Sequence, residues 1–444
     1  MRRIFIFFGP LYLVLNLSVK GELKDLKVRK NERVIIFAPH PDDEILACGG
    51  LIQKVLKKKG KIWIVYLTNG DHNQLVYRLY EKKIVLKPED YIKLGKIRRK
   101  ESIMATKNLG IPSSNLIFLG YPDFGTMKIW KDYWGKDTEP FESFLTRAKF
   151  VPYEENYSYG KPYIGDSILS DIEKILLGIK PTKIFSTGSY DKNVDHRALY
   201  NFLRCALLNL KSKISPEVYV YLVHFEKWPF PYEFNPGLSL FPPSALDNLK
   251  WYNLKLGKEE IEKKYNSIKF FKSQIFLKKK WFFSFARENE IFYQENEEEI
   301  KDGFVLSYES EKEAEFKNRE NISIPYNIFL IGKEEGIEVQ LIQKKRFLRP
   351  VNYIFYFYGW RKDIPFPDMP KVKISLRKRR EILKIENSTI YERLKYEKEK
   401  RKITFRVNWI TLGRPQYLFF STEVKTGGIT YDFIPWKLIK INFN

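Results

Sequence analysis

A short stretch near the start of the chain concentrates polar groups that can do chemistry. A hydrophobic run over residues 34–38 is followed within a few positions by four such side chains: His40, Asp42, Asp43 and Glu44. Acidic residues favour helix N-termini, but a cap needs only one of them. Burying so many polar groups together is costly unless a cation or other partners receive them. The stretch therefore predicts a metal site.

A second polar stretch follows a predicted strand at residues 183–186 and opens a helical pattern with Asp195 and His196. Ligands of an open α/β sheet bind at the carboxyl ends of its strands, so we expect the two stretches to meet at one edge. A catalytic zinc site typically uses three protein ligands and leaves a position for water, and His40, Asp43 and His196 are a suitable set. Taken alone, His196 would be interpreted as a surface histidine.

The elements that must position these residues alternate along the chain up to about residue 300. Short β-branched or aromatic runs alternate with segments of helical period, which is typical of parallel βαβ units. Strands are predicted at residues 34–38, 62–68, 116–119, 183–186 and 218–224, and helices at 45–58, 91–109, 166–178 and 195–210. The predicted fold class is α/β, a Rossmann-like open, mostly parallel sheet with helices on both faces.

The later chain follows a different pattern. Residues 227–243 are rich in proline and aromatic residues and predict a long functional loop, and residues 258–285 predict a helical segment. Alternating stretches at 372–376, 403–410 and 417–424, separated by glycine, proline and charged turns, are typical of a β-sandwich. We predict a catalytic domain over residues 28–300 and an accessory β-rich domain over 315–444.

The N-terminus has the order of a secretory signal. Arg2 and Arg3 precede an apolar stretch over residues 4–19, and the chain becomes strongly charged from Lys20 onward. The stretch is short for a membrane span, which needs about 20 apolar residues. We expect residues 1–21 to be a signal peptide or an N-terminal anchor, and the protein to be exported to the cell envelope or the medium. A buried first strand is the alternative.

The composition is basic, with 78 Lys and Arg against 54 Asp and Glu, a net charge of +24. Such a balance invites a nucleic-acid interpretation, but the cations are spread along the chain without a recognised motif, so no nucleic-acid partner is expected. A basic surface also suits an anionic envelope. The two cysteines, Cys48 and Cys205, lie in apolar helical runs and exclude a disulfide framework.

The two polar stretches together resemble the PIG-L (LmbE-like) deacetylase family. The resemblance is carried by residues 40–44, by Asp195 and His196, and by the segment from Arg98 to Glu101. It continues through residues 221–224, 228–229, 273–274 and 287–292, and so covers roughly residues 30–295. The C-terminal portion lies outside it.

This resemblance implies a zinc-dependent N-deacetylase that acts on N-acetylglucosaminyl groups or related amides. By motif position it implies that His40, Asp43 and His196 bind the metal and that Asp42 is the general base. Zinc, or another divalent metal, lowers the pKa of its bound water and polarises the amide carbonyl, while the neighbouring carboxylate takes the proton.

The chain departs from the family pattern at Asn193, where a histidine often stands three residues before the second ligand histidine. An asparagine can donate a hydrogen bond to an oxyanion but cannot deliver a proton. The general acid is therefore open. We expect Asp42 to carry the proton to the leaving amine, with His224 as the substitute.

Three further residues are predicted to contact the substrate, each with a structural alternative. Arg98 could bind substrate hydroxyls or pair with Glu101. Asp123 follows a strand end and resembles a sugar-contacting position, or it forms a turn. Tyr190 could offer its hydroxyl to substrate, or pack within its loop. His72 is expected on a loop surface.

Two functions from different classes remain open at this stage. One is an exported amino-sugar deacetylase. The other is a catalytically impaired glycan-binding protein of the cell envelope, in which the β domain supplies recognition. Both predict an N-acylated amino sugar or glycoconjugate as partner, with glycan or envelope contact through the C-terminal domain. A Rossmann-like enzyme of another type is disfavoured, because no glycine-rich dinucleotide fingerprint follows the first strand.

Overall fold

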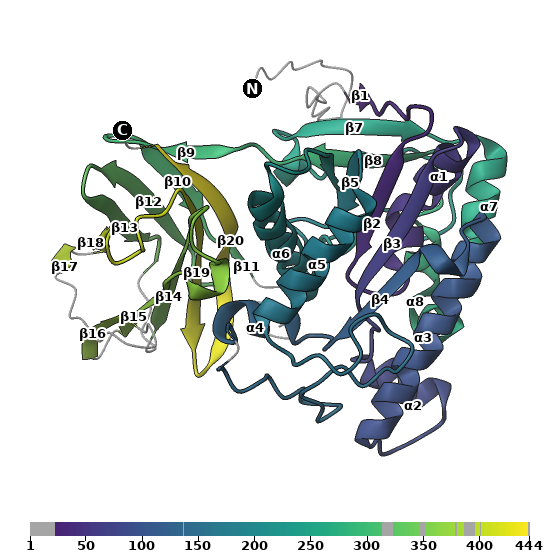
Figure 1. Ribbon diagram of the computed structural model, residues 1–444, viewed down its shortest axis with the longest axis horizontal. Helices are drawn as coiled ribbons and strands as arrows, with labels where there is room; N and C mark the ends of the chain where they lie inside the picture. The colour runs from purple at the N-terminus through teal and green to yellow at the C-terminus, as the bar shows by residue number, and fades with distance from the viewer. Residues whose placement is uncertain are drawn as a thin grey trace, which may run out of the picture.

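A computed structural model describes residues 23–135, 137–312, 323–345, 351–377, 380–385, 396–399 and 401–442. The predicted signal or anchor segment, residues 1–21, lies outside these ranges. Within them an α/β part is followed by a β part, and the two lie side by side (Figure 1). No helix in the described ranges has both the length and the apolar character needed to cross a membrane.

The α/β part is built on an eight-stranded sheet of order β1-β7-β8-β6-β5-β2-β3-β4. Its strands are β1 (Lys24–Asp25), β2 (Arg33–Ala38), β3 (Lys61–Thr68), β4 (Leu116–Tyr121), β5 (Lys183–Ser186), β6 (Glu217–Val220), β7 (Lys250–Lys255) and β8 (Asn289–Gln294). Five neighbouring pairs are parallel, and β8 is antiparallel to both of its neighbours. The predicted open, mostly parallel sheet is confirmed.

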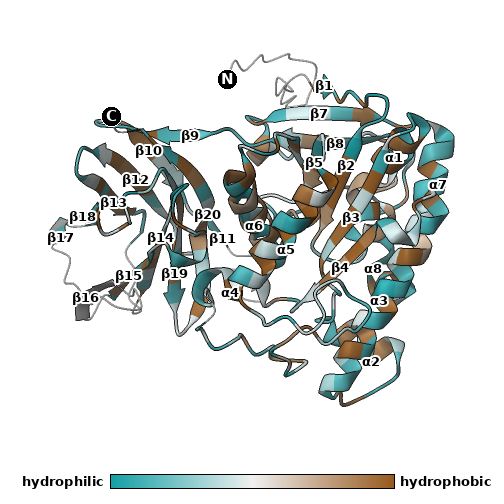
Figure 2. Cartoon of the chain, viewed as in Figure 1, coloured by the Kyte–Doolittle hydropathy of each residue, from teal (hydrophilic) through white to brown (hydrophobic). Residues whose placement is uncertain are grey.

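Helices cover both faces of this sheet. They are α1 (Asp43–Lys57), α2 (Gln74–Tyr80), α3 (Pro88–Leu109), α4 (Thr126–Asp132), α5 (Gly165–Ile179), α6 (Val194–Leu210), α7 (Lys258–Ile268) and α8 (Lys272–Phe283). In β2, Val34 and Ile36 join the core under α1, whereas Ile35 and Phe37 join the core under α5 and α6. A strand that is buried on both faces needs a continuous hydrophobic run. Hydrophobic residues are brown in Figure 2, where they mark the middle of strand β2.

The sheet differs from the prediction beyond β6. The predicted strand 218–224 ends at Val220, because the backbone N–H groups of Val223 and His224 donate to Asp191 Oδ2 at 3.1 and 3.0 Å. The prediction also lacks β7 and β8, whose pairing is non-local and places Trp251 opposite Tyr293. The predicted helical segment 258–285 is two helices, α7 and α8, separated by a turn at the buried Phe271.

The C-terminal part consists of two sheets packed as a sandwich, as predicted. Their orders are β10-β12-β13-β18-β17 and β11-β20-β19-β14-β15-β16. The strands are β9 (Glu298–Ile300), β10 (Val305–Glu309), β11 (Glu311–Lys312), β12 (Tyr326–Lys333), β13 (Gly336–Gln343), β14 (Asn352–Trp360), β15 (Lys371–Arg377), β16 (Arg380–Ile385), β17 (Tyr396–Glu399), β18 (Lys402–Asn408), β19 (Tyr417–Thr426) and β20 (Ile429–Ile441). Burial alternates along β12, so one face enters the core between the sheets.

A shared aromatic core joins the two parts. Trp130 of α4 is fully buried, and its ring centre lies 5.2 Å from that of Phe419 and 5.6 Å from that of Trp436. Across the same contact the Tyr358 hydroxyl donates to the Lys131 carbonyl at 2.6 Å. Burial of large aromatic rings from both sides stabilises the contact. The β part is therefore packed onto α4 and α6, next to the segment that carries His196.

Candidate metal centre

The two polar stretches meet at one edge of the sheet. Strands β2 and β5 are parallel neighbours, with Ile36 opposite Phe185, so their carboxyl ends lie side by side. The loop after β2 carries His40, and the first residue of α1 is Asp43. The loop after β5 leads into α6, whose first turn carries His196. The predicted meeting of His40, Asp43 and His196 is what the structure contains.

The donor atoms of these residues form a compact triangle. Asp43 Oδ2 lies 3.3 Å from His40 Nδ1 and 3.1 Å from His196 Nε2, and the two nitrogens are 3.3 Å apart. A tetrahedral zinc ion with bonds of about 2.0–2.1 Å requires donors about 3.3–3.4 Å apart. In addition, Asp43 Oδ1 is buried without a hydrogen-bond partner among the described residues. The residues present therefore fit a small divalent cation.

Two carboxylates hold His40 in the orientation that this triangle needs. His40 Nε2 lies 3.1 Å from Asp123 Oδ1 and 3.5 Å from Asp195 Oδ2, so its Nδ1 atom is left to face Asp43. Burial disfavours a charged ring, but the charge and hydrogen bond of Asp123 outweigh it and raise the pKa of His40 well above its usual value. Carboxylates behind a ligand histidine fix its tautomer and increase its basicity.

Asp191 plays the corresponding part for His196. His196 Nδ1 lies 3.2 Å from Asp191 Oδ2 and 3.0 Å from the Thr187 hydroxyl, which leaves Nε2 in the donor triangle. Burial would lower the pKa of His196, but the Asp191 and Asp43 carboxylates outweigh it and raise that pKa to about 9. Asp191 also accepts the backbone N–H groups of Asn193, Val223 and His224, and so ties the two loops together.

Asp42 lies beside the triangle on a constrained backbone. Its φ of 135° is rarely adopted by a residue with a side chain, and such conformations concentrate at functional sites. Glu44 Oε2 accepts the Asp42 backbone N–H at 2.9 Å, and Arg98 Nη2 donates to Asp42 Oδ2 at 2.9 Å. Burial, offset in part by Arg98, raises the pKa of Asp42 to about 7.

Arg98 is a partner of Asp42. Its guanidinium is buried and also donates to the carbonyl groups of Pro41 and Gly70, at 3.0 and 2.8 Å. The alternative of a pair with Glu101 is wrong, because Glu101 instead accepts hydrogen bonds from Ser273 at 2.7 Å. Substrate contact by Arg98 stays a prediction.

His224 lies against the ligand histidine. Its ring centre is 4.8 Å from that of His196, and one of its nitrogens is close enough to join His40, Asp43 and His196 in a group of potential metal donors. Burial and the neighbouring His196 lower the pKa of His224 to about 4, so the ring is neutral near pH 7. The Trp281 ring of α8 stacks on the His224 ring, with the ring centres 5.4 Å apart.

Two other predicted residues have structural partners. The Asn193 side-chain oxygen accepts the Asp195 N–H at 2.8 Å and caps α6, so that oxygen is engaged in the helix start. Tyr190 faces the β part, where its hydroxyl lies 3.1 Å from Lys437 Nζ. Their predicted catalytic and substrate-binding roles stay predictions.

The sequence analysis missed the supporting residues Asp191, Thr187 and Trp281 and the orienting role of Asp123 and Asp195. Thr187 and Asp191 both follow β5 in the loop that leads to His196, and this position was the available signal. Trp281 carried no signal, because α8 reaches His224 only through tertiary packing.

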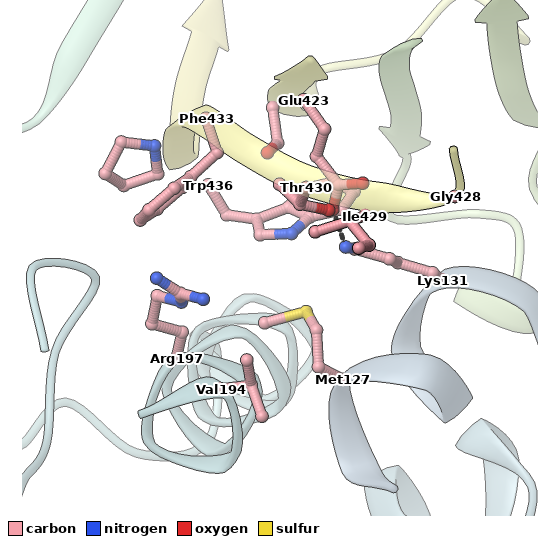
Figure 3. A pocket seen from close by; sticks show the side chains of 12 residues that line it. Met127, Lys131, Val194, Arg197, Glu423, Gly428, Ile429, Thr430, Phe433 and Trp436 are labelled. Atoms are coloured by element: carbon pink, nitrogen blue, oxygen red, sulfur yellow. Dashed lines mark hydrogen bonds and ion pairs between the residues drawn. The ribbon is translucent and has the colours of Figure 1, made fainter. Parts of the chain in front are cut away.

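A cavity of about 250 Å³ lies where α6 meets the β part (Figure 3). Its walls include Lys131 and Arg197 on one side and Glu423, Phe433 and Trp436 on the other. The Arg197 guanidinium carbon lies 4.1 Å from the centre of the Phe433 ring. Arg197 follows His196 directly, so the cavity and the metal centre share the first turn of α6.

The family model described as PIG-L: GlcNAc-PI de-N-acetylase matches residues 35–207. This range contains the donor triangle and Asp42, and within it the match confirms the resemblance predicted from the sequence. A putative glucosamine-6-phosphate deaminase-like protein of Bacteroides thetaiotaomicron is 26% identical over 179 residues, which are 37% of this chain and 26% of that protein. The chain thus spans about a quarter of that curated relative.

Solved structures are similar to part of this chain at low sequence identity and low TM-score. The A40926 pseudoaglycone deacetylase Dbv21 is 17% identical with a TM-score of 0.38, over 60% of this chain and 97% of that chain. The N,N'-diacetylchitobiose deacetylase of Pyrococcus horikoshii is 17% identical, with a TM-score of 0.35 over 59% and 82% of the two chains. The 4-carboxy-2-hydroxymuconate hydratase GalB of Pseudomonas putida is 16% identical, with a TM-score of 0.35 over 57% and 82%.

Proposed function

We propose that this protein is a divalent-metal-dependent hydrolase, with zinc as the cation, that removes an N-acetyl group from an N-acetylglucosamine-type amino sugar or its conjugate. The observation that carries the proposal is the donor triangle of His40, Asp43 and His196 with the buried Asp42 carboxylate beside it. The matched family model is named for a GlcNAc-PI de-N-acetylase and the curated relative for glucosamine-6-phosphate, which supports an amino-sugar substrate.

The donor triangle would hold the cation through His40 Nδ1, Asp43 Oδ2 and His196 Nε2. The chemistry that a bound cation supplies is polarisation of the scissile carbonyl and a lowered pKa of a coordinated water. Burial would raise the pKa of Asp43, but His196 and His40 hold it well below its usual range, so this donor is ionised at neutral pH. Three protein donors leave room for water and substrate.

Asp42 is the proposed general base. Arg98 holds its Oδ2 atom, whereas its Oδ1 atom takes no hydrogen bond within the described part of the chain. With a pKa of about 7, this carboxylate can accept a proton from the attacking water and release it again. The water oxygen forms the new bond to the carbonyl carbon. The C–N bond then breaks as Asp42 returns the proton to the amine nitrogen.

Asn193 and His224 have supporting roles in this proposal. Asn193 cannot transfer a proton, and its side-chain oxygen caps α6. Its side-chain N–H groups can still donate a hydrogen bond to the oxyanion. His224 is neutral near pH 7, so it offers a ring N–H to the oxyanion or the amine and is a poor source of a full proton. Both arguments leave the proton transfer with Asp42.

Release of acetate from chitooligosaccharides and from other N-acetylglucosamine conjugates tests the proposal. We expect turnover that a chelator abolishes and added zinc restores. Asp42→Asn keeps the size of the side chain and its contact with Arg98 but removes the base, so it should bind zinc normally and lose activity by about 100-fold or more. Turnover that survives both the chelator and Asp42→Asn would refute the mechanism.

The alternative is a glycan-binding protein without turnover. It is favoured by one observation, the engagement of Asn193 in the α6 cap where the family pattern often has a histidine. The same assay separates the two, because a binder would retain zinc and bind an acetylated oligosaccharide but release no acetate from a broad panel. Restoring the histidine with Asn193→His would then raise turnover from zero.

The proposal includes the cell envelope as the place of action and the β part as a glycan contact. The apolar N-terminal stretch and the charged residues after it support export. The cavity beside α6 offers aromatic rings and charged groups of the kind that bind sugars. Fractionation of cells that express the full chain tests the first point, and loss of oligosaccharide binding in Phe433→Ala with zinc affinity unchanged tests the second.

A further inference from the structure

Two packed helices expose an unusual number of large apolar side chains. Helix α2, the turn after it and α8 carry six of them: Leu75, Leu79, Ile84, Val85, Phe276 and Leu277. The exposed fractions reach 88% for Ile84, 74% for Val85 and 59% for Phe276. The helices are in contact, and Asn73 Nδ2 donates to Gln274 Oε1 at 2.8 Å, so these side chains lie on adjoining elements, here called the α2–α8 face. Single exposed apolar residues are ordinary, but a gathered set marks an interaction site.

The α2–α8 face is also positively charged. Two lysines of α8, Lys279 and Lys280, come shortly after Leu277 in the sequence and are exposed. Neither makes an ion pair within the described part of the chain. Of the three acidic residues nearby, Glu81 pairs with Lys93 at 2.9 Å and Asp90 pairs with Lys83, whereas Glu89 is exposed, so cations outnumber free carboxylates on this face. Arg78 and Lys82, on the α2 side, add two more exposed cations. Apolar side chains are therefore interspersed with uncompensated positive charge.

Both helices of this face reach the metal centre. His72, just before α2, donates its backbone N–H to Asp123 Oδ2 at 2.9 Å, and Asp123 holds the ligand His40. At the other helix, Trp281 of α8 stacks on His224. In Figure 1 the two helices lie together on the lower right of the α/β part, away from the β part. The elements of this face are therefore connected to the metal centre through His72 and Trp281.

We infer that the α2–α8 face docks on an anionic lipid bilayer. Exposed leucine, isoleucine and phenylalanine enter the headgroup region, and lysine and arginine side chains around them bind acidic headgroups, as in other interfacial helices. A second copy of the same face is a poor partner, because it would bring uncompensated cations of one sign together. The inference does not rest on the proposed reaction, since docking is measured without turnover.

Vesicle sedimentation of the full chain tests the inference. We expect binding to vesicles of mixed phosphatidylglycerol and phosphatidylcholine that weakens in high salt and is much lower with phosphatidylcholine alone. Two double variants, Phe276→Ser with Leu277→Ser and Lys279→Glu with Lys280→Glu, should each weaken partition by more than about tenfold. Matched changes in the β part, Ile410→Ser and Lys345→Glu with Lys362→Glu, should leave it unchanged.

Hydrogen exchange with and without vesicles locates the contact, which matters because residues 4–19 are apolar and every variant carries them. Protection of α2 and α8 by vesicles supports the inference. Partition that the face variants leave intact, protection confined to other segments, or a dimer that the same variants dissociate without any vesicle binding would each overturn it. Acetate release in free solution is expected to stay normal in the face variants, which separates this test from that of the proposed function.

Discussion

Substitution of Asp123 by asparagine tests whether a carboxylate outside the donor triangle sets metal affinity. Asp123 Oδ1 lies 3.1 Å from His40 Nε2, and its other oxygen accepts the His72 N–H at 2.9 Å. The asparagine side chain is nearly the same size as that of aspartate, so the backbone contact can persist while the charge behind His40 is lost. Removal of such outer partners typically weakens metal binding by about 10- to 100-fold, which is about 1.4–2.7 kcal/mol.

The structure places the expected loss near the lower end of this range. Asp195 Oδ2 remains 3.5 Å from His40 Nε2 and can take over part of the interaction. The loss should also shrink at acid pH, because Asp123 raises the pKa of His40 and so favours the proton that competes with the metal. We therefore expect about a tenfold weaker zinc affinity at pH 8 and a smaller difference at pH 6.

Titration with zinc against a chromophoric chelator measures this affinity directly, without a substrate. Asp171→Asn is the matched control, because Asp171 is a fully buried carboxylate that accepts from the Tyr121 hydroxyl at 2.8 Å and makes no contact with the donor triangle. The control should lose stability and keep its zinc affinity. Unchanged zinc affinity in Asp123→Asn, together with a strong loss in His40→Ala, would refute the orienting role of Asp123.

Three further outcomes follow from the same geometry. Arg98→Met should reduce kcat by about tenfold or more and leave zinc affinity unchanged, because it removes the group that positions Asp42. Equal losses of kcat and of zinc affinity would contradict this role. The chelated protein should become less stable in thermal unfolding as pH rises from 6 to 9. The protonated His196 ring, with a pKa of about 9, stabilises the fold below pH 6.5, and this stabilisation is lost as the ring deprotonates. Burial raises the pKa of Glu44 to about 8, so its ionisation destabilises the fold increasingly up to that pH. A stability that rises between pH 6 and 9 would contradict this prediction. Added zinc should reverse the loss of stability with rising pH. Trp130→Ala should cost about 3–5 kcal/mol in urea unfolding, since this ring joins the two parts.

The regular elements near the site could be predicted because their signals are local. Residues 34–38 are apolar without interruption, as a strand buried on both faces must be, and the helical periods after residues 43 and 194 define α1 and α6. The broken helix at Phe271 and the strands β7 and β8 could not be predicted in the same way. Their form depends on burial of Phe271 and on the pairing of Trp251 with Tyr293, which lie on either side of helices α7 and α8 in the sequence.

The amino-acid sequence by itself determined which groups are available for chemistry: a histidine and neighbouring acids after one strand, and a second histidine at the start of a helix after another. Strand order and parallel direction then bring them to one edge, and this much follows from local pattern. Only the tertiary structure decided how each group is used. Distances between side chains assign Arg98 to Asp42, Asp123 to His40 and Asp191 to His196, because a hydrogen bond depends on position in space.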